Sequence, residues 1–176
     1  KCMSMGLLMK EDAPVVWRGP MISKALYQLF RGAKWDELDY LVVDLPPGTG
    51  DIHLSIAQNF SVAGAVIVTT PQEISLIDVK KCINMLKKVN ISIIGIVENM
   101  SYFEDSTGNK NFIFGKEGGK KLAETLGTKL LGEIPLNPDI TETSDSGNPV
   151  SISKPEEKTA KIFEDIARSV TNIVVL

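Results

Sequence analysis

The chain has 176 residues, of which 43% are apolar and 23% are charged, a balance typical of a globular α/β domain and unlike that of a disordered tail, a disulfide-rich miniprotein or a collagen-like fibre. Lys and Arg number 19 and Asp and Glu number 22, so the net charge is −3 and a nucleic acid partner is not expected. No apolar run approaches the roughly 20 residues that span a bilayer, so no membrane role is expected either.

Short apolar runs rich in β-branched residues alternate with helical patterns along the chain. In chain order, these patterns predict a helix at residues 21–30, a strand at 40–44, a helix at 51–59, a strand at 65–69, a helix at about 71–88, a strand at 91–97, a loop at 104–111, a helix at 116–126, a strand at 129–134, a loop at 137–149 and a C-terminal helix from about 155. The strands are almost continuously apolar, which indicates a parallel sheet covered by helices on both faces. The sequence therefore predicts one doubly wound α/β domain over residues 1–176.

Two of the helices carry clear start signals. Thr70, Pro71 and Glu73 offer an N-cap hydroxyl, a proline at the first helical position and a capping-box glutamate. Before the C-terminal helix, Ser153 likewise offers a capping hydroxyl and Pro155 a proline near the helix start. One apolar face of that helix is predicted from residues at helical spacing, namely Phe163, Ile166, Ala167, Val170 and Val174.

The segment 41–51, LVVDLPPGTGD, holds the sharpest chemical signal. Asp44 ends an apolar strand, at the edge where parallel sheets bind ligands, and a carboxylate there can hold hydrated Mg²⁺. Gly48 and Gly50 leave backbone N–H groups accessible to a phosphate. The alternative is a tight strand-to-helix turn in which Asp44 only accepts hydrogen bonds. His53, the single histidine, follows in the next helix, where we expect a structural or solvent-facing role, with a contact to the preceding turn as the alternative.

Five strings together resemble a known family. They are residues 40–51, WRGP at 17–20, ENMS at 98–101, IFG at 113–115 and GEIPL at 132–136. With them the chain resembles, over essentially its whole length, the Mrp/ApbC group of P-loop ATPases, which are iron–sulfur cluster carrier and assembly proteins similar in fold to MinD and ParA. The resemblance implies a mostly parallel sheet flanked by helices.

The resemblance also implies roles for the residues of the Asp44 segment. Asp44 would be the Walker-B carboxylate, acting in catalysis and holding Mg²⁺ through water. Pro46, Pro47 and Gly48 would form the switch that senses the γ-phosphate of ATP, with Gly48 taking part in catalysis.

Two further residues would bind the base of the nucleotide. Asn99 matches the family asparagine whose amide reads the adenine edge, and Pro135 lies where the family lines the base pocket. Both follow predicted strands, as Asp44 does, so one ligand is expected to touch all three. The alternative for Asn99 is a cap or turn residue.

The phosphate-binding loop GxxxxGK[ST] has no match in the chain. The only Gly-Lys pairs lie within residues 115–121, at the wrong spacing. In the family this loop lies upstream of the matched region, so we expect the chain to be a C-terminal piece of the ATPase domain that lacks the first strand and the Walker A loop. Such a piece is expected to be inactive alone, and its exposed apolar surface is expected to cause self-association or marginal stability.

The cysteine pair of the family's cluster carriers is also absent. These carriers place C-x-x-C between the NMS and IFG strings, where this chain has no cysteine in residues 102–112. Glu104 and Asp105 are hard oxygen ligands that do not replace thiolates. Cys82 and Cys2 lie elsewhere and do not stand in for the pair, which argues against cluster carriage by this motif.

The resulting function is ATP-dependent iron–sulfur cluster carriage or assembly, with ATP and Mg²⁺ as cofactors, a homodimer as the assembly and apo iron–sulfur proteins as clients. The expected location is the cytoplasm, with an organelle as the alternative. Two other functions stay open. One is a non-enzymatic module that dimerises or binds clients without nucleotide turnover, and the other is a MinD- or ParA-like positioning ATPase.

Overall fold

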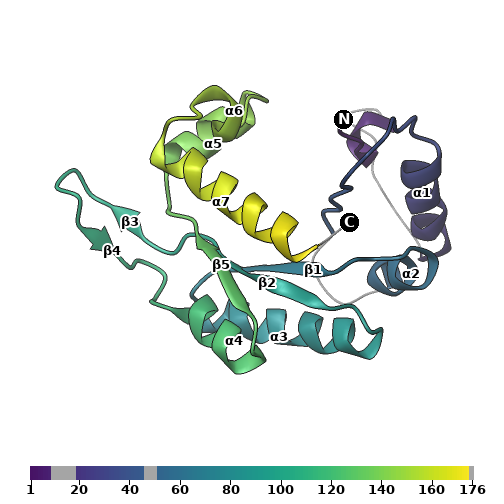
Figure 1. The fold of residues 1–176 in the computed structure, drawn as a ribbon, viewed down its shortest axis with the longest axis horizontal. Helices are drawn as coiled ribbons and strands as arrows, with labels where there is room; N and C mark the ends of the chain where they lie inside the picture. Colours follow the sequence, from purple (N-terminus) through teal and green to yellow (C-terminus); the bar gives the residue numbers. More distant parts are fainter. Residues whose placement is uncertain (9–18, 46–50, 175–176) are drawn as a thin grey trace. The chain divides into compact units, whose positions relative to one another are not determined.

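A computed structural model of the chain describes residues 1–8, 19–45 and 51–174, which fall into two units, Lys1–Ser61 and Val62–Val175 (Figure 1). The described elements of the first unit are the 3₁₀ helix η1 (Met5–Leu8), α1 (Gly19–Arg31) and α2 (Asp51–Asn59). The predicted helix at 51–59 is confirmed in its bounds, and α1 extends the one predicted at 21–30. Phe30 stacks on Phe60 with ring centroids 4.1 Å apart, which joins the end of α1 to the end of α2.

The strand predicted at residues 40–44 is not formed, and this prediction was wrong. The segment has no regular secondary structure, and Val42 is 91% exposed, with Leu41 and Val43 also exposed. A strand needs a neighbour to pair its backbone N–H and C=O groups, and no described residue pairs with this segment. Apolar composition alone therefore did not produce a strand here.

The second unit is built on a three-stranded parallel sheet of order β1-β2-β5. Its strands are β1 (Ala65–Thr69), β2 (Ile93–Glu98) and β5 (Lys129–Glu133). They confirm the predictions at 65–69, 91–97 and 129–134 to within two residues. Helix α3 (Glu73–Lys88) connects β1 to β2, and α4 (Gly118–Leu126) precedes β5. Parallel neighbours require such crossovers, which is why strands and helices alternate in the sequence.

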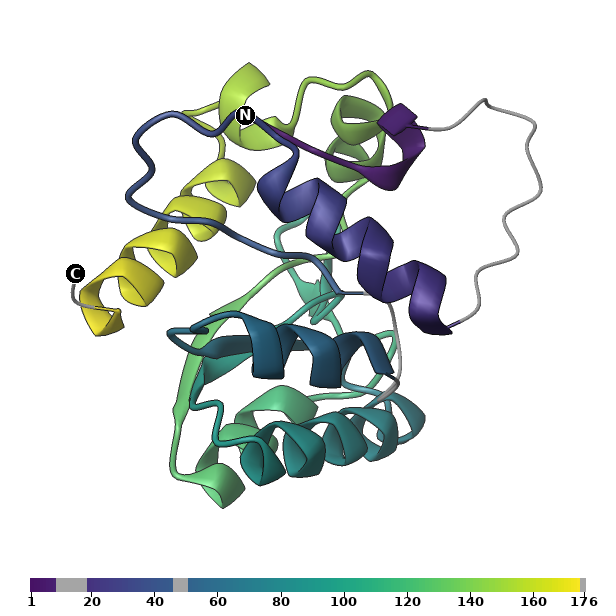
Figure 2. The ribbon, with the colours of Figure 1, turned by 90° about the vertical axis from the view of Figure 1, so that its right-hand side faces the viewer.

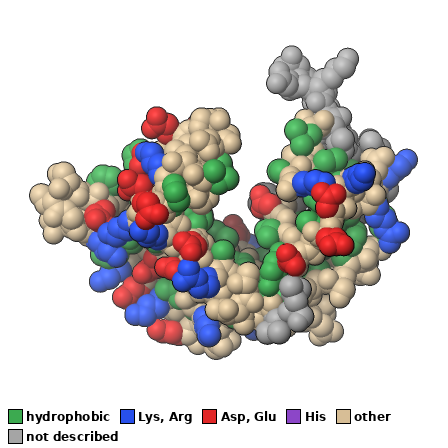
Figure 3. Space-filling model, turned by 45° about the horizontal axis from the view of Figure 1, so that its top comes forward, with side chains coloured by type: hydrophobic (Ala, Val, Ile, Leu, Met, Phe, Trp, Pro, Cys, Tyr) green, Lys and Arg blue, Asp and Glu red, His purple; other side chains and the backbone are tan. Residues whose placement is uncertain are grey.

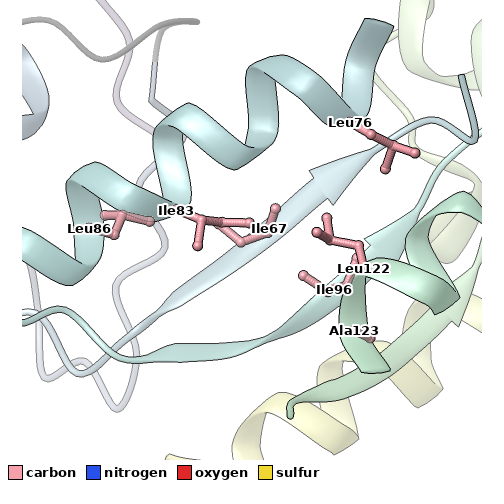
Figure 4. Packing of buried hydrophobic residues seen from close by; sticks show 7 residues of the cluster. All are labelled: Ile67, Leu76, Ile83, Leu86, Ile96, Leu122 and Ala123. Carbon is pink, nitrogen blue, oxygen red and sulfur yellow. The ribbon is translucent and has the colours of Figure 1, made fainter. Parts of the chain in front are cut away.

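Helices cover both faces of this sheet, as the sequence predicts for a doubly wound fold. Helices α3 and α4 lie on one face and α7 (Lys158–Ile173) lies on the other (Figures 1 and 2). On the first face, Ile83 of α3 lies against Ile67 of β1, and Leu122 of α4 lies against Ile96 of β2 (Figure 4). Ile96 is fully buried. The sheet is therefore the core of the unit.

The opposite face brings α7 onto β2 and β5. Val97, Leu131 and Ile134 form its buried centre, and half-buried residues that pack against them include Ile162, Phe163, Ile166 and Val170. Phe163, Ile166 and Val170 confirm the predicted apolar face. Ala167 is exposed, and Ile162 takes part in its place.

The predicted starts of two helices were wrong, and two short helices were not predicted. Helix α3 begins after Gln72 rather than after Thr70, and α7 begins after Glu157 because a separate turn, α6 (Val150–Ser153), comes before it. The predicted loop at 137–149 contains helix α5 (Pro138–Asp145), whose start is capped by the Asn137 side chain accepting the Asp139 N–H at 2.9 Å.

The predicted loop at 104–111 is a short antiparallel hairpin. Its strands are β3 (Phe103–Glu104) and β4 (Lys110–Asn111), and it leaves the sheet after β2 and returns before α4. In the part of the chain that the structure describes, no helix is long and apolar enough to cross a membrane.

Candidate functional site

The carboxyl ends of β2 and β5 meet at one edge of the sheet and bring Asn99 and Pro135 together. Asn99 directly follows β2, and Pro135 lies two residues beyond β5. Backbone hydrogen bonds join the two segments: Ile134 N donates to Glu98 O at 2.8 Å, and Ser101 N donates to Ile134 O at 2.9 Å. The two residues predicted to bind the base therefore lie on neighbouring segments.

Asn99 has a fixed orientation in this edge. Its backbone N–H donates to Thr69 O at 2.7 Å, and its side-chain Oδ1 accepts the Met100 N–H at 2.9 Å. Because Oδ1 is engaged, Nδ2 faces away from the Met100 amide, and no described residue accepts its hydrogen bonds. The side chain is half-buried, and its Nδ2 group keeps its hydrogen-bonding capacity.

The end of β1 adds hydroxyl groups to the same edge. Thr69 Oγ1 lies 3.1 Å from Ser75 Oγ, and Thr70 N donates to Ser75 Oγ at 3.3 Å. Thr70 Oγ1 is shielded from solvent and has no partner among the described residues. A buried hydroxyl without a partner carries an energetic cost.

Behind Asn99 lies Glu98, a carboxylate with no exposed surface. Its Oε1 accepts the Ser101 hydroxyl at 2.6 Å, and its Oε2 accepts the backbone N–H of Gly119 in the first turn of α4. Glu133, at the end of β5, lies 3.3 Å from the same Ser101 hydroxyl. Sequence reasoning assigned no role to Glu98, although a charged residue ending an apolar strand was a signal.

The β3–β4 hairpin lies between the NMS and IFG strings, where the resemblance implies a cysteine pair in cluster carriers. Asp105 organises its turn by accepting hydrogen bonds from Thr107 and Asn109, which lower the pKa of its carboxyl to about 2. Glu104 forms an ion pair with Lys158 at the start of α7. Hydrogen bonds and charge pairing therefore hold this hairpin, and sulfur plays no part in it.

The two cysteines lie in different units, and neither unit has a second cysteine. Cys2 is exposed in the first unit, and Cys82 is half-buried on α3, where burial raises the pKa of its thiol and so disfavours the thiolate. Within residues 1–8, 19–45 and 51–174, no group of three or more His, Cys, Asp or Glu side chains is placed to hold a metal ion.

Asp44 belongs to the first unit, where its side chain is exposed. Pro46, Pro47 and Gly48 lie outside the described residues. His53 is 5% exposed, and its Nδ1 is buried without a partner among the described residues, which fits the structural role included in the expectation.

Charge does not single out another site. On the face shown in Figure 3, acidic and basic side chains are interspersed over the surface. At the opposite, amino-terminal edge of the sheet a shallow hollow of about 310 Å³ is lined by residues that include Lys87, Ile91 and Thr128. It has a single charged side chain and no carboxylate. The edge with Asn99 and Pro135 is therefore the candidate site.

Comparison with known proteins identifies one family. The family described as ParA, NUBPL iron-transfer P-loop NTPase, matches residues 1–171. An Arabidopsis thaliana protein named iron-sulfur protein required for NADH dehydrogenase, mitochondrial, is 52% identical over 171 residues, covering 97% of this chain and 55% of its own length. An Aquifex aeolicus iron-sulfur cluster carrier protein is 47% identical over 176 residues, covering 99% of this chain and 48% of its own length. The chain spans about half the length of the curated relatives it matches.

Solved structures give the same fold. A nucleotide-binding protein from Archaeoglobus fulgidus, in complex with ADP, is 37% identical with a TM-score of 0.69, over 82% of this chain and 57% of that one. The cell division ATPase MinD of Pyrococcus furiosus is 28% identical with a TM-score of 0.64, over 86% of this chain and 59% of that one.

Proposed function

The chain belongs to the ParA-like family of NUBPL iron-transfer P-loop NTPases, and from this premise we propose that it serves iron–sulfur cluster delivery or assembly and uses ATP with Mg²⁺ to do so. The relatives named as a cluster carrier and as an iron-sulfur protein support the cluster role. The neighbour in complex with ADP supports the nucleotide role.

The observation that carries the nucleotide proposal is the edge formed by Asn99 and Pro135. Asn99 Nδ2 would donate a hydrogen bond to a ring nitrogen of adenine, and Pro135 would pack against the face of the base. The available Nδ2 of Asn99 fits a polar ligand at the carboxyl ends of parallel strands. These residues bind and orient the nucleotide.

The phosphate end would be served by the segment that carries Asp44. We propose that Asp44 holds Mg²⁺ through water, and that Pro46, Pro47 and Gly48 form the switch that responds to the γ-phosphate, with Asp44 and Gly48 acting in catalysis. The exposed carboxylate of Asp44 is a hard oxygen donor of the kind that Mg²⁺ prefers. Bound Mg²⁺ would supply neutralisation of phosphate charge.

The iron–sulfur cluster is cargo in this proposal, and the described residues do not fit it. Cys2 and Cys82 belong to separate units and are not a C-x-x-C pair, so we derive no ligation step from this chain. We propose a homodimer that acts on apo iron–sulfur proteins in the cytoplasm. The mitochondrial name of the Arabidopsis relative makes an organelle the alternative.

The nucleotide proposal is tested by calorimetric titration of the full-length gene product with MgATP. Replacing Asn99 by Ala removes one hydrogen bond to the base and should weaken binding about tenfold. The matched control is Asn172→Ala, because Asn172 is an exposed asparagine on α7. Equal affinity of the wild type and Asn99→Ala would remove Asn99 from the site, and no binding by the wild type would overturn the nucleotide role.

The cluster proposal is tested by elemental analysis after anaerobic reconstitution with Fe²⁺ and sulfide. We expect transfer of a cluster to an apo iron–sulfur client, followed by the client's absorbance. A colourless gene product without iron that leaves the client unchanged would contradict cluster carriage.

A non-enzymatic module that dimerises or binds clients is the second candidate. The observation that favours it is the lack of a GxxxxGK[ST] loop in the 176 residues, because that loop supplies the amides and the lysine that wrap the phosphates. MgATP would then leave the melting temperature of the protein unchanged. A MinD- or ParA-like positioning ATPase is the third, and a basic surface or a membrane-binding tail would distinguish it.

A further inference from the structure

Glu98 is the most deeply buried ionisable side chain in the described part of the chain, and its position directly precedes Asn99. A carboxylate without any exposed surface is retained only where hydrogen bonds replace its lost hydration. The groups that replace it come from two different segments, and both of them border the proposed nucleotide site.

The first segment is the turn that carries Asn99. The Ser101 hydroxyl donates to Glu98 Oε1 at 2.6 Å, so the side chains at the two ends of the ENMS string are joined directly. Between them, Met100 adopts a left-handed conformation with φ of 52°, which is unfavourable for a residue with a Cβ. The Glu98–Ser101 bond therefore closes a strained turn around Asn99.

The second segment is the start of α4. Glu98 Oε2 accepts the Gly119 N–H, which satisfies one of the unpaired amides in the first helical turn. The helix approaches so closely that a Cβ at position 119 would lie 3.0 Å from Glu98 Cβ. Glu117, immediately before the helix, is also left-handed, with φ of 59°. A second strained residue thus flanks the same carboxylate.

We propose that Glu98 and Ser101 are positioning residues that hold the Asn99–Met100 turn in the conformation needed to discriminate the base of a nucleotide. The Glu98–Ser101 bond fixes the turn, and the Gly119 contact anchors the carboxylate to α4. This inference rests on the proposed nucleotide function of the same edge. It goes beyond that function because neither side chain would touch the ligand.

The test combines two measurements on Ser101→Ala. In the full-length gene product, affinities for MgATP and MgGTP give the preference for adenine, which should fall about tenfold because a mobile Asn99 no longer selects its hydrogen-bonding pattern. In the 176-residue chain, amide hydrogen exchange at Met100 and Ser101 should accelerate, while exchange in β1 stays unchanged. A merely structural role would lower stability and leave the adenine preference as it is.

Two controls and a second variant keep the outcome decisive. Ser153→Ala removes an exposed serine hydroxyl that donates to Pro149 O, and Glu124→Gln neutralises an exposed carboxylate on α4; both should match the wild type. Glu98→Gln keeps the shape of the side chain and should lower the adenine preference in the same direction as Ser101→Ala.

Failure of the positioning role and failure of the nucleotide function give different results. If the wild type prefers ATP and Ser101→Ala keeps that preference, the positioning role is overturned, whatever happens to exchange. If the wild type binds neither nucleotide, the proposed function fails together with the base discrimination built on it, and exchange at Met100 then decides only whether the turn is held by Ser101.

Discussion

One carboxylate organises the turn of the β3–β4 hairpin. Asp105 accepts hydrogen bonds from Thr107 Oγ1 at 2.6 Å, from Thr107 N at 2.9 Å and from Asn109 N at 3.0 Å. Hydrogen bonds donated to a carboxylate favour its ionised form, and they lower the pKa of the Asp105 carboxyl from 3.8 to about 2. The pKa of Asp105 is lower in the folded than in the unfolded chain, so its ionised carboxylate stabilises the fold. This stabilisation is fully present above pH 3.8 and is lost as the pH falls through about 2.

Replacing Asp105 by Ala should accelerate amide exchange at Thr107 and Asn109, because both amides lose their acceptor. The control is Asp145→Ala, which removes an exposed aspartate at the end of α5. In the wild type, carboxyl carbon resonances should report an Asp105 midpoint at about pH 2. A midpoint near 3.8 would mean that the turn hydrogen bonds are not formed in solution.

Between elements, glycines in the strands set how closely side chains pack on the sheet. A Cβ at Gly132 of β5 would lie 2.6 Å from Ile166 Cγ1 of α7, and a Cβ at Gly95 of β2 would lie 2.5 Å from Leu131 Cγ. Interiors are close-packed, so an added methyl group at either position forces its neighbour to move. Gly132 is therefore a position where α7 comes very close to the sheet.

Gly132→Ala should lower the free energy of unfolding by about 1–3 kcal/mol through overpacking. Urea denaturation measures this, and a double-mutant cycle with Ile166→Ala assigns the cause. When Ile166 is truncated, the added methyl group has room, so the double mutant should lose less stability than the sum of the single mutants. Strict additivity would show that the two side chains do not meet.

The elements that could be predicted are those whose signal is local and periodic. The strand at 65–69 and the helix at 51–59 have the predicted bounds, because apolar continuity and helical spacing are carried by the residues themselves. Helix α5 was missed because a polar composition was interpreted as a loop, although Asn137 before Pro138 is an N-cap followed by proline at the first position.

The candidate site could be predicted only in part. Asn99 and Pro135 were found because they match the family's motifs and because residues that follow parallel strands collect at one sheet edge. Glu98 ends an apolar strand, which was a signal, but its burial could not be predicted because the Gly119 amide, 21 residues away in the sequence, is brought to it by the fold.

For the whole molecule, an exposed apolar segment dominates the expected behaviour in solution. Residues 40–43 are all exposed, and Val42 is 91% exposed. Contiguous apolar surface of this kind favours association. This exposure supports the prediction from sequence that the chain self-associates.

Val42→Lys should reduce concentration-dependent association of the 176-residue chain, as measured by sedimentation velocity. The matched control is Ile152→Lys, at an apolar residue on α6 that is 72% exposed and lies outside this segment. We expect the control to associate as the wild type does. A wild-type chain that stays monomeric and melts at a high temperature would contradict the prediction.

The late position of α7 in the chain has a consequence for synthesis. β1, α3 and β2 follow one another between residues 65 and 98, so the ribosome can release them as a strand–helix–strand unit whose first face is already partly covered. The other face, with Val97 and Leu131, stays bare until residues 158–173 have been translated. During that interval the apolar residues of this face lack the α7 side chains that pack on them in the folded chain, which favours association of the nascent chain with other apolar surfaces.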